Sequence, residues 1–323
     1  MRRSARLGPS PHGDDARQVA AAFGLDPESV LDLAASLNPF APDVTGIAGH
    51  RLDALQRYPD SHDRHSATSA LAGALGVDPE RVLLTNGGSE AIALVASELG
   101  RGWVEEPEFA LYRRHLPRLE PDGPRFRSDP HNPTGMLAPA GATAAVWDEA
   151  FYPLATGRWT RGDLAQGASI IIGSLTKAFA CPGLRIGFVL APSGDTGMIG
   201  RLSRRQPQWS VNGLALAVLP ELLAQADPAA WAASIATARR ALVAVLVARG
   251  LQPRASDVNY VLVDGASGLH AQLARRGVVV RDCSSFGMPG SVRVAVPDEH
   301  GLARLDAALA AAGASTGDQE LAG

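Results

Sequence analysis

Lysine is almost absent from this chain of 323 residues, in which a single lysine, Lys177, stands among 29 arginines. An arginine guanidinium stays charged and is a poor nucleophile, whereas a desolvated lysine amine can lose its proton and form a Schiff base. A lysine-poor composition can also leave one lysine by chance. The residues around Lys177 must therefore decide between the two interpretations.

Other absences exclude whole classes of function. Two cysteines, Cys181 and Cys283, are too few for a disulfide framework and lack the spacing of metal ligands, so we expect no metal site and a reducing cytoplasm. A formal net charge of −3 gives no basic footprint for nucleic acid. The longest aliphatic run, 241–248, is far shorter than the roughly 20 residues of a spanning helix, so we expect no membrane partner.

The apolar pattern predicts two domains. Hydrophobic residues form 46% of the chain, which is typical of a globular protein long enough for one large and one smaller domain. From 81 to 191 short apolar runs alternate with helical patterns, which predicts an α/β sheet with helices on both faces. A helical region over about 211–250, with breaks at Pro220 and Pro228, precedes a compact α+β pattern. The predicted strands are 81–85, 102–105, 144–147, 169–172 and 185–191, then 258–263, 278–282 and 291–296.

These patterns predict four parts of the chain. An N-terminal arm over 1–45 belongs to the small domain and the active-site entrance, and a large domain covers 46–235. A small C-terminal domain covers 236–313, and a disordered tail covers 314–323.

Two motifs suggest ligand contacts in the large domain. Thr85-Asn86-Gly87-Gly88-Ser89-Glu90 follows a predicted strand and opens a predicted helix, where glycines and a helix N-terminus suit an anion. Alone, such a sequence is more often only a turn. Phe109, near the end of the next strand, is by itself an ordinary core residue or a ring that stacks on a ligand.

Two further motifs suit an aromatic cofactor ring. In His131-Asn132-Pro133-Thr134-Gly135 the Asn132 amide can hydrogen-bond a ring oxygen, while proline and glycine fix a tight turn. Trp147-Asp148-Glu149-Ala150-Phe151 ends an apolar run with two carboxylates. A carboxylate at a buried strand end can keep a pyridine nitrogen protonated, so that the ring accepts electrons. The alternative for Asp148 is a helix N-cap.

The surroundings of Lys177 complete the pattern. Ser174-Leu175-Thr176-Lys177 and Pro182-Gly183-Leu184-Arg185 place two hydroxyls, one amine and one guanidinium close together. This combination predicts a phosphate clamp around a nucleophilic amine.

Taken in order, these motifs resemble the fold-type-I pyridoxal-phosphate enzymes of the class I/II aminotransferase superfamily over nearly the whole chain. The resemblance implies a mostly parallel, seven-stranded-type sheet in a large PLP-binding domain and a smaller α+β domain. It implies that pyridoxal 5'-phosphate (PLP) forms a Schiff base with Lys177 and pairs its pyridine nitrogen with Asp148. The other implied cofactor contacts are Asn132 at the ring hydroxyl, Phe109 stacked on the ring, and Gly88, Ser89, Ser174, Thr176 and Arg185 at the phosphate. It also implies a homodimer in which Tyr58 reaches the phosphate bound by the neighbouring subunit.

Narrower features resemble the branch that contains threonine-phosphate decarboxylase of cobalamin biosynthesis and histidinol-phosphate aminotransferase. His12-Gly13, the Asn38-Pro39 segment and Gln208-Trp209-Ser210-Val211-Asn212 resemble segments of the decarboxylase. The resemblance implies that Arg293 binds the substrate carboxylate, and that Arg281 with His12 binds a substrate phosphate, as guanidinium geometry suits. The implied substrate site is completed by Gly13, Asn38 and Asn132. The alternative for Arg293 is a surface position on a strand.

The chain departs from this pattern in two places. Phe109 and Asn132 are only 23 residues apart, which indicates that one element of the large domain is trimmed and that 117–124 is a bare connection. Phe151 stands where many transaminases have a tyrosine that bonds the ring oxygen.

The resemblance implies a PLP-dependent enzyme for a phosphorylated amino acid or amine. Our first hypothesis is a lyase, an L-threonine-O-3-phosphate decarboxylase; the alternative is an aminotransferase for a substrate such as histidinol phosphate. The reaction depends on which Cα bond stands perpendicular to the ring, and Arg281 and Arg293 would set that torsion by holding the two anionic ends. A third hypothesis is a non-catalytic PLP-binding protein, against which the intact Lys177, Asp148 and Arg185 argue.

Overall fold

The computed structural model describes residues 16–161 and 168–320, and side chains as far as residue 313. The chain divides into two compact units. The small unit takes in the chain up to Pro39, the short segment Pro133–Met136 and the chain from Ser234 onward. The large unit comprises Phe40–Asn132 and Leu137–Ala233. The unit boundaries lie at 39/40 and 233/234, whereas the predicted domain boundaries are 45/46 and 235/236, and the assignment of 133–136 to the small unit was not predicted.

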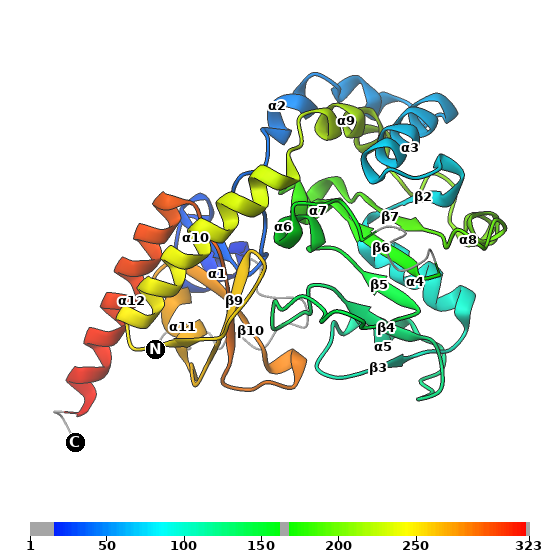
Figure 1. Cartoon of the computed structure of the whole chain (residues 1–323). Helices are drawn as coiled ribbons and strands as arrows, with labels where there is room; N and C mark the ends of the chain where they lie inside the picture. The colour runs from blue at the N-terminus through cyan, green and yellow to red at the C-terminus, as the bar shows by residue number, and fades with distance from the viewer. Residues whose placement is uncertain (1–15, 162–167, 321–323) are drawn as a thin grey trace. The chain divides into compact units, whose positions relative to one another are not determined.

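The large unit is built on a six-stranded sheet in the order β2-β7-β6-β5-β4-β3 (Figure 1). Its strands in the described chain are β2 (Val82–Thr85), β3 (Trp103–Val104), β4 (Arg125–Ser128), β5 (Val146–Asp148), β6 (Ile170–Ser174) and β7 (Gly187–Leu190). Strands β3 to β6 are parallel, and β7 is antiparallel to both β6 and β2. The β-branched run Ile170–Ile172 is buried, as in a parallel strand covered on both faces. The predicted α/β class and mostly parallel sheet are confirmed, with six strands in the described sheet where the resemblance implies the seven-stranded type.

The edge of this sheet shows what remains of the trimmed region. Gly102, just before β3, forms an isolated parallel bridge with Leu119. The Gly102 N–H donates to the carbonyl of Arg118 at 3.0 Å, and the Glu120 N–H donates to the carbonyl of Gly102 at 2.9 Å. Part of the segment predicted as a bare connection therefore pairs with the sheet edge.

Helices cover the sheet and bury its apolar residues. Helices α4 (Gly87–Leu99), α5 (Leu111–His115) and α8 (Met198–Arg205) share one core with the strands. Ile92 and Val95 of α4 pack in this core with Ile172 of β6. The other α-helices in the described part of this unit are α2 (Val44–Gly49), α3 (Ser61–Leu75), α6 (Tyr152–Thr156), α7 (Leu175–Ala178) and α9 (Gly213–Ala224).

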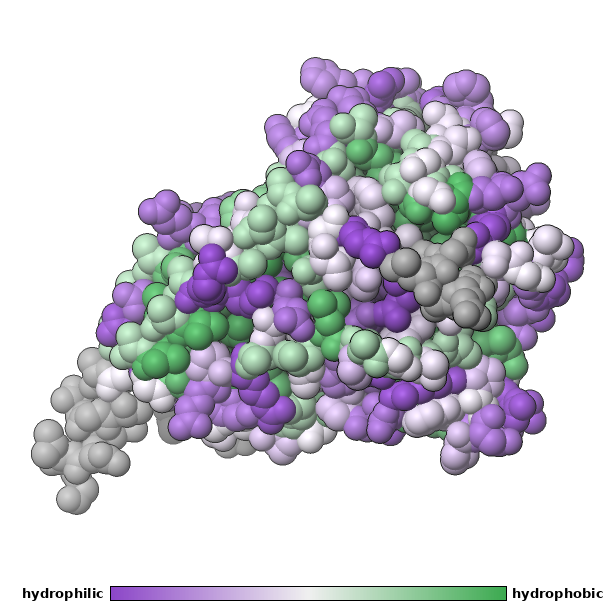
Figure 2. All heavy atoms as spheres, in the orientation of Figure 1, coloured by the Kyte–Doolittle hydropathy of each residue, from purple (hydrophilic) through white to green (hydrophobic). Residues whose placement is uncertain are grey.

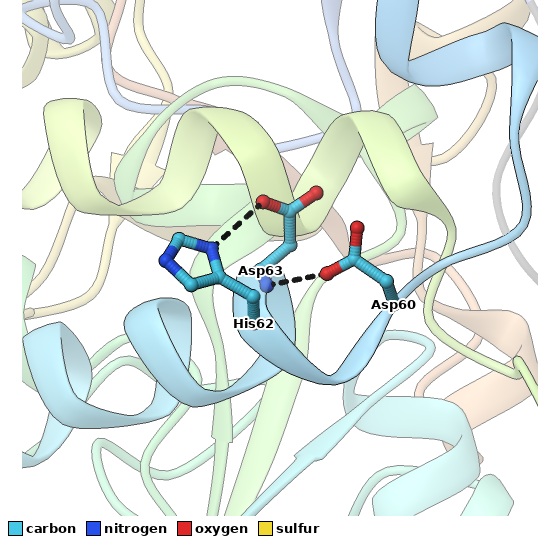
Figure 3. A group of neighbouring side chains, drawn as sticks. All are labelled: Asp60, His62 and Asp63. Carbon is cyan, nitrogen blue, oxygen red and sulfur yellow. Dashed lines mark hydrogen bonds and ion pairs between the residues drawn. The ribbon is translucent and has the colours of Figure 1, made fainter.

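Helix α3 begins at a cluster of acidic groups that has a structural explanation. The Asp60 carboxylate accepts the Asp63 N–H at 2.8 Å, as an N-cap does, while His62 lies beside Asp63 (Figure 3). The Arg57 guanidinium pairs with Asp60 at 2.5 Å and with Asp63 at 2.6 Å. Because the Arg57 guanidinium already pairs with both carboxylates of this cluster, we assign no metal ion to it.

The prediction that Pro220 breaks a helix is wrong. Pro220 lies inside α9, whose Leu216, Leu219 and Leu222 are fully buried. Packing of that apolar face holds the helix together across the proline, although the ring removes one backbone donor. Pro228 does mark a boundary, because α10 (Pro228–Ala248) begins there.

Helix α10 contains the boundary between the units at 233/234. In the described chain it is the one helix that is long and apolar enough to cross a membrane by length and composition alone. Core helices pass the same test, and Leu242 and Leu246 of α10 belong to the small-unit core. The surface over α10 is mostly pale green in Figure 2, which reflects its many alanines.

The small unit contains a five-stranded sheet in the order β1-β10-β11-β9-β8. In the described part of this unit the strands are β1 (Leu31–Leu33), β8 (Gln252–Pro253), β9 (Tyr260–Asp264), β10 (Val278–Asp282) and β11 (Val292–Ala295). The α-helices there, besides α10, are α1 (Ala16–Phe23), α11 (Leu269–Ala274) and α12 (Glu299–Glu320). Only β1 and β10 pair in parallel. Helix α12 corrects the predicted tail, because it continues through 314–320; Gly317 and the polar residues there lower helix propensity without ending the helix.

Candidate active site

Three strands of the large unit bring reactive or ligand-binding side chains to the same end of the sheet, where the strands finish. Thr85 ends β2, Asp148 ends β5 and Ser174 ends β6. These strands run in the same direction, since β2 and β6 are both antiparallel to β7. Ligands of open α/β sheets bind outside the carboxyl ends of such strands. Most of the predicted cofactor residues therefore lie at or just after the carboxyl ends of these strands.

Arg185 lies against the glycine-rich turn that opens α4. Its backbone is left-handed (φ 55°), and its guanidinium donates to the carbonyls of Pro182 at 3.2 Å and Asn86 at 3.4 Å. A Cβ at Gly87 would lie 2.3 Å from Arg185 Nη2, so only glycine permits this approach. The Asn86 side chain does not cap α4, which leaves that role open to a bound anion.

Ser174 and Thr176 adjoin the same turn. Their hydroxyl oxygens are 2.9 Å apart, and the Ser174 Cβ would be 3.2 Å from a Cβ at Gly88. Ser89 is exposed in the first turn of α4. We call Gly88, Ser174, Thr176 and Arg185 the anion cradle. Its hydroxyls, guanidinium and backbone amides are the donor types that fit a phosphate group such as that of PLP.

Gly187 makes the cradle compact, which leads to a prediction for a Gly187→Ala variant. The added Cβ would lie 2.6–2.8 Å from backbone atoms of Gly87, Gly173 and Gly88. Backbone cannot turn aside as a side chain can, so we expect a loss of about 1–3 kcal/mol in the free energy of unfolding. We also expect weaker PLP binding, measured by titration.

Gly183→Ala is the matched control for this variant. Gly183 lies in the neighbouring turn, and its added Cβ meets nothing within 4 Å. We expect its stability and PLP affinity to stay near those of the wild type. Equal stability of the two variants would contradict the tight packing inferred at Gly187.

Asp148 is a buried carboxylate whose hydrogen-bond donors are neutral. The Tyr112 hydroxyl donates to its Oδ2 at 2.8 Å, and the Ala150 N–H donates to its Oδ1 at 3.0 Å. Burial raises the pKa of Asp148, although both hydrogen bonds lower it. A protonated pyridine nitrogen would supply the positive charge that favours ionised Asp148, so this residue fits PLP.

Several buried side chains near Asp148 were not predicted from the sequence. Tyr112 of α5 is fully buried, and its ring meets Phe109 edge-on with centroids 5.9 Å apart. Phe109 itself packs against the core of the large unit. The Ser128 hydroxyl of β4 accepts the Asn132 N–H at 2.8 Å, and Glu108 lies next to Ser128. The spacing of three between Phe109 and Tyr112 is the one sequence signal that places both on one face of a turn.

Glu149, next to Asp148, belongs to a structural ion-pair network. Arg161 pairs with Glu149 at 2.9 Å and also with Asp129, and its guanidinium lies 3.7 Å from the centre of the Trp147 ring. Thr160 donates to the same Glu149 carboxylate at 2.5 Å. These contacts engage Glu149 fully, whereas Asp148 has only neutral donors.

Lys177 and Tyr58 lie on other elements of the large unit. Lys177 is partly buried in α7, directly after β6. Tyr58 is 74% exposed and its ring lies 4.6 Å from that of Trp209, which has a left-handed backbone. Asn212, from the same motif as Trp209, caps α9 and donates to the carbonyl of Leu184, beside Arg185. The 208–212 motif is thus hydrogen-bonded, through Asn212, to the turn that contains Arg185.

The predicted substrate residues Asn38, Arg281 and Arg293 belong to the small unit. Arg281 and Arg293 are cross-strand partners on β10 and β11, and both are buried. The Arg281 guanidinium donates to the Ser285 hydroxyl at 2.8 Å, and that of Arg293 lies over the Tyr260 ring at 4.5 Å. His12 and Gly13 lie outside the described residues.

Asn38 follows a segment held by a buried amide. The Asn259 side chain donates to the carbonyls of Ser36 at 2.8 Å and Leu37 at 3.1 Å. Ser36 has a left-handed backbone (φ 51°), and Asn38 is itself buried. Asn259 thereby fixes the turn that leads to Asn38.

Comparisons with known proteins identify a family and several similar chains. The family model described as aminotransferase class I and II matches residues 128–310. The chain is 27% identical to histidinol-phosphate aminotransferase 2 of Ralstonia nicotianae, over 96% of both proteins. It is 31% identical to threonine-phosphate decarboxylase of Salmonella typhimurium, over 64% of this chain and 68% of that protein. The structure of histidinol-phosphate aminotransferase from Sinorhizobium meliloti, in complex with pyridoxal-5'-phosphate, is similar with a TM-score of 0.79 at 17% identity, over 98% of both chains.

Proposed function

Because this chain belongs to the aminotransferase class I and II family, we propose that it is a PLP-dependent enzyme for a small phosphorylated amino acid or amine. Enzymes of this family use PLP, so the cofactor predicted from the motifs is confirmed for the family. When bound, the cofactor supplies an electron-accepting ring that stabilises negative charge at the substrate Cα.

The residues of the large unit divide the work of holding that cofactor. The anion cradle would bind its phosphate, and Asp148 would keep its ring nitrogen protonated. Asn132 would contact the ring hydroxyl and Phe109 would stack on the ring. The Lys177 amine would carry the cofactor and move a proton at the substrate Cα.

The cross-strand pair Arg281 and Arg293 is the observation that supports a substrate with two anionic groups. Like charges placed directly opposite each other destabilise a sheet, and here both guanidinium groups are also buried. Binding of a carboxylate and a phosphate would offset that cost with bidentate hydrogen bonds. Following the family resemblance, we assign the substrate carboxylate to Arg293 and the phosphate to Arg281.

We favour decarboxylation as the reaction, with L-threonine O-phosphate as substrate. The 208–212 motif, which resembles that of the decarboxylase, is attached to the Arg185 turn and stacks Trp209 on Tyr58. The second candidate is an aminotransferase for a phosphorylated amine such as histidinol phosphate. The relative from Ralstonia nicotianae, similar over nearly the full chain, supports it.

The exposed Tyr58 supports a homodimer. A tyrosine that is 74% exposed beside a half-exposed Trp209 suits burial against a second copy of the chain. We propose that Tyr58 reaches the cofactor phosphate of the partner subunit. The two buried free cysteines are compatible with the proposed cytoplasmic location.

The decisive experiment compares two substrates with PLP-loaded protein. With L-threonine O-phosphate alone we expect carbon dioxide and aminopropanol phosphate, because decarboxylation needs no oxo acid. A parallel reaction of histidinol phosphate with 2-oxoglutarate is assayed for glutamate. Glutamate without carbon dioxide would contradict the decarboxylase and establish the aminotransferase.

An Arg293→Lys variant tests the substrate site in the same assay. Lysine keeps the charge but loses the bidentate geometry, so we expect KM to rise by about tenfold or more. Arg240→Lys is the matched control, because Arg240 is an exposed arginine of the small unit. An unchanged KM in the Arg293 variant would remove that residue from the proposed site.

A further inference from the structure

Glu90 lies in the first turn of α4, and the proposed function assigns it no role. Its Oε2 accepts three hydrogen bonds from neutral donors: the Asn86 N–H at 2.7 Å, the Gln206 side-chain amide at 3.0 Å and the Ser210 hydroxyl at 3.0 Å. A residue that only caps the start of a helix needs the first of these contacts. The other two donors lie 116 and 120 positions away in the sequence, so Glu90 also holds a distant segment.

The distant segment covers residues 206–212, and we call it the Trp209 loop. At its start, the Gln206 amide nitrogen also donates to the carbonyl of Leu84 at 2.9 Å. At its end, the Asn212 side chain donates to the carbonyl of Leu184 at 2.8 Å. Leu84 and Leu184 directly precede the glycine-rich motif and Arg185. The Trp209 loop is therefore fixed at both ends beside residues of the anion cradle.

Between these two anchors, Trp209 has a strained backbone. Its φ of 55° is left-handed, which is unfavourable for a residue with a Cβ. Its half-exposed ring lies 4.6 Å from the ring of Tyr58. A strained conformation persists only where the surrounding contacts hold it, and such residues cluster at functional sites. Ser210, whose hydroxyl donates to Glu90, is the next residue in the chain, so this contact acts directly beside the strained position.

On its other side, Glu90 is linked to the anion cradle through Asn86. The Asn86 N–H donates to Glu90, while the Asn86 carbonyl accepts the Arg185 guanidinium at 3.4 Å. The N–H groups of Gly88 and Ser89 follow in the first turn of α4, where backbone donors have no acceptor within the helix and suit a phosphate. The two contacts of Asn86 thus fix the turn that orients these amides.

We propose that Glu90 is a positioning residue that joins the Trp209 loop to the anion cradle, so that the Trp209 ring and the phosphate-binding amides keep one fixed arrangement. Both segments donate to the same carboxylate oxygen, so a displacement of either one lengthens a hydrogen bond to Glu90. All of these residues belong to the large unit. This inference rests on the proposed binding of the PLP phosphate in the anion cradle.

The test measures two properties of a Glu90→Ala variant of the full-length protein. The first is the exciton band in circular dichroism that the closely spaced rings of Tyr58 and Trp209 produce, which a Trp209→Phe variant identifies by its loss. Without the carboxylate, Trp209 should relax to an ordinary backbone conformation, and we expect the band to disappear. The second is the dissociation constant of PLP from the apo-protein. We expect it to rise by about tenfold, because the turn loses the acceptor that holds Asn86.

Glu98→Ala is the matched control from the same helix. Glu98 accepts the guanidinium groups of Arg201 at 2.5 Å and Arg205 at 3.0 Å, both from α8. This substitution also removes contacts between α4 and a neighbouring element, but none of them involves Asn86 or the Trp209 loop. We expect a lower denaturation midpoint in both variants, with the exciton band and the PLP affinity of Glu98→Ala unchanged.

Ser210→Ala is a milder change that keeps Glu90 and its contact with Asn86. We expect it to weaken the exciton band and to raise the dissociation constant of PLP by about threefold, since one of the three hydrogen bonds is lost. A wild-type band and wild-type PLP affinity in Ser210→Ala, or in a folded Glu90→Ala, would overturn the inference while leaving the proposed function intact. A wild-type protein that does not bind PLP at all would overturn both.

Discussion

A Lys177→Ala variant is expected to lose at least about 10³-fold of wild-type turnover, because it lacks the amine that we propose carries the cofactor and moves a proton at Cα. Lys177 is the only lysine in the chain, so no second side-chain amine can replace it. The measurement is kcat with the substrate identified by the paired assays.

Chemical trapping gives an independent test of the same residue. Borohydride reduction of the PLP-loaded wild type should fix one cofactor on the peptide that contains Lys177, as mass spectrometry can establish. Lys177→Arg is the matched control, since it keeps a cation in α7 but cannot form a Schiff base. We expect it to fold and to be as inactive as Lys177→Ala. Full turnover in either variant would refute every catalytic role assigned to Lys177.

Sequence predicted best those parts whose chemistry is local. The pattern predicts a strand at 278–282, and β10 spans Val278–Asp282, because a run of buried β-branched residues suits a strand. The anion cradle follows from motifs in which each residue sits at a strand end or in the next turn. Parallel strands bring such ends together without further information from side chains.

Sequence failed where distant residues decide the structure. Strand β4 reads Arg-Phe-Arg-Ser, which is too polar to signal a strand, and it is identified only by its pairing with β3 and β5. The hydrogen bonds from Ser128 to Glu108 and from Tyr112 to Asp148 join residues that lie 20 and 36 positions apart. No local pattern predicts such contacts, because the partners meet only after the sheet has formed.

The choice between lyase and aminotransferase is likewise not determined by a local sequence pattern. In the proposed site both reactions would use the same lysine, the same carboxylate and the same pair of arginines, so their motifs overlap. They would differ in the torsion about one substrate bond, which a small displacement of Arg281 or Arg293 would change. Motifs therefore identify the family and the cofactor, while the reaction itself is assigned by the substrate assays.

Asp148→Asn is expected to lower kcat by about 10²–10³-fold, although the substituted side chain has nearly the same shape. An amide carries no charge with which to keep a pyridine nitrogen protonated, so the ring would accept electrons less readily. Glu149→Gln is the matched control, because it replaces the adjacent buried carboxylate with an amide in the same way. Since Glu149 pairs with Arg161, we expect that variant to lose stability rather than kcat.

The same Asp148→Asn substitution that lowers kcat should leave the free energy of unfolding unchanged or raise it. Burial raises the folded-state pKa of Asp148 above its unfolded value, so the folded protein binds the proton more tightly. As pH rises from the unfolded-state pKa to the folded-state pKa, Asp148 ionises and the free energy of unfolding falls. Asparagine does not ionise, so the variant does not lose this free energy. At neutral pH we expect the apo-variant to unfold at an equal or higher denaturant concentration than wild-type apo-protein. Lower apo-stability at neutral pH would show that Asp148 serves the fold, whereas a more stable and nearly inactive variant would mark a carboxylate kept for chemistry at a cost in folding.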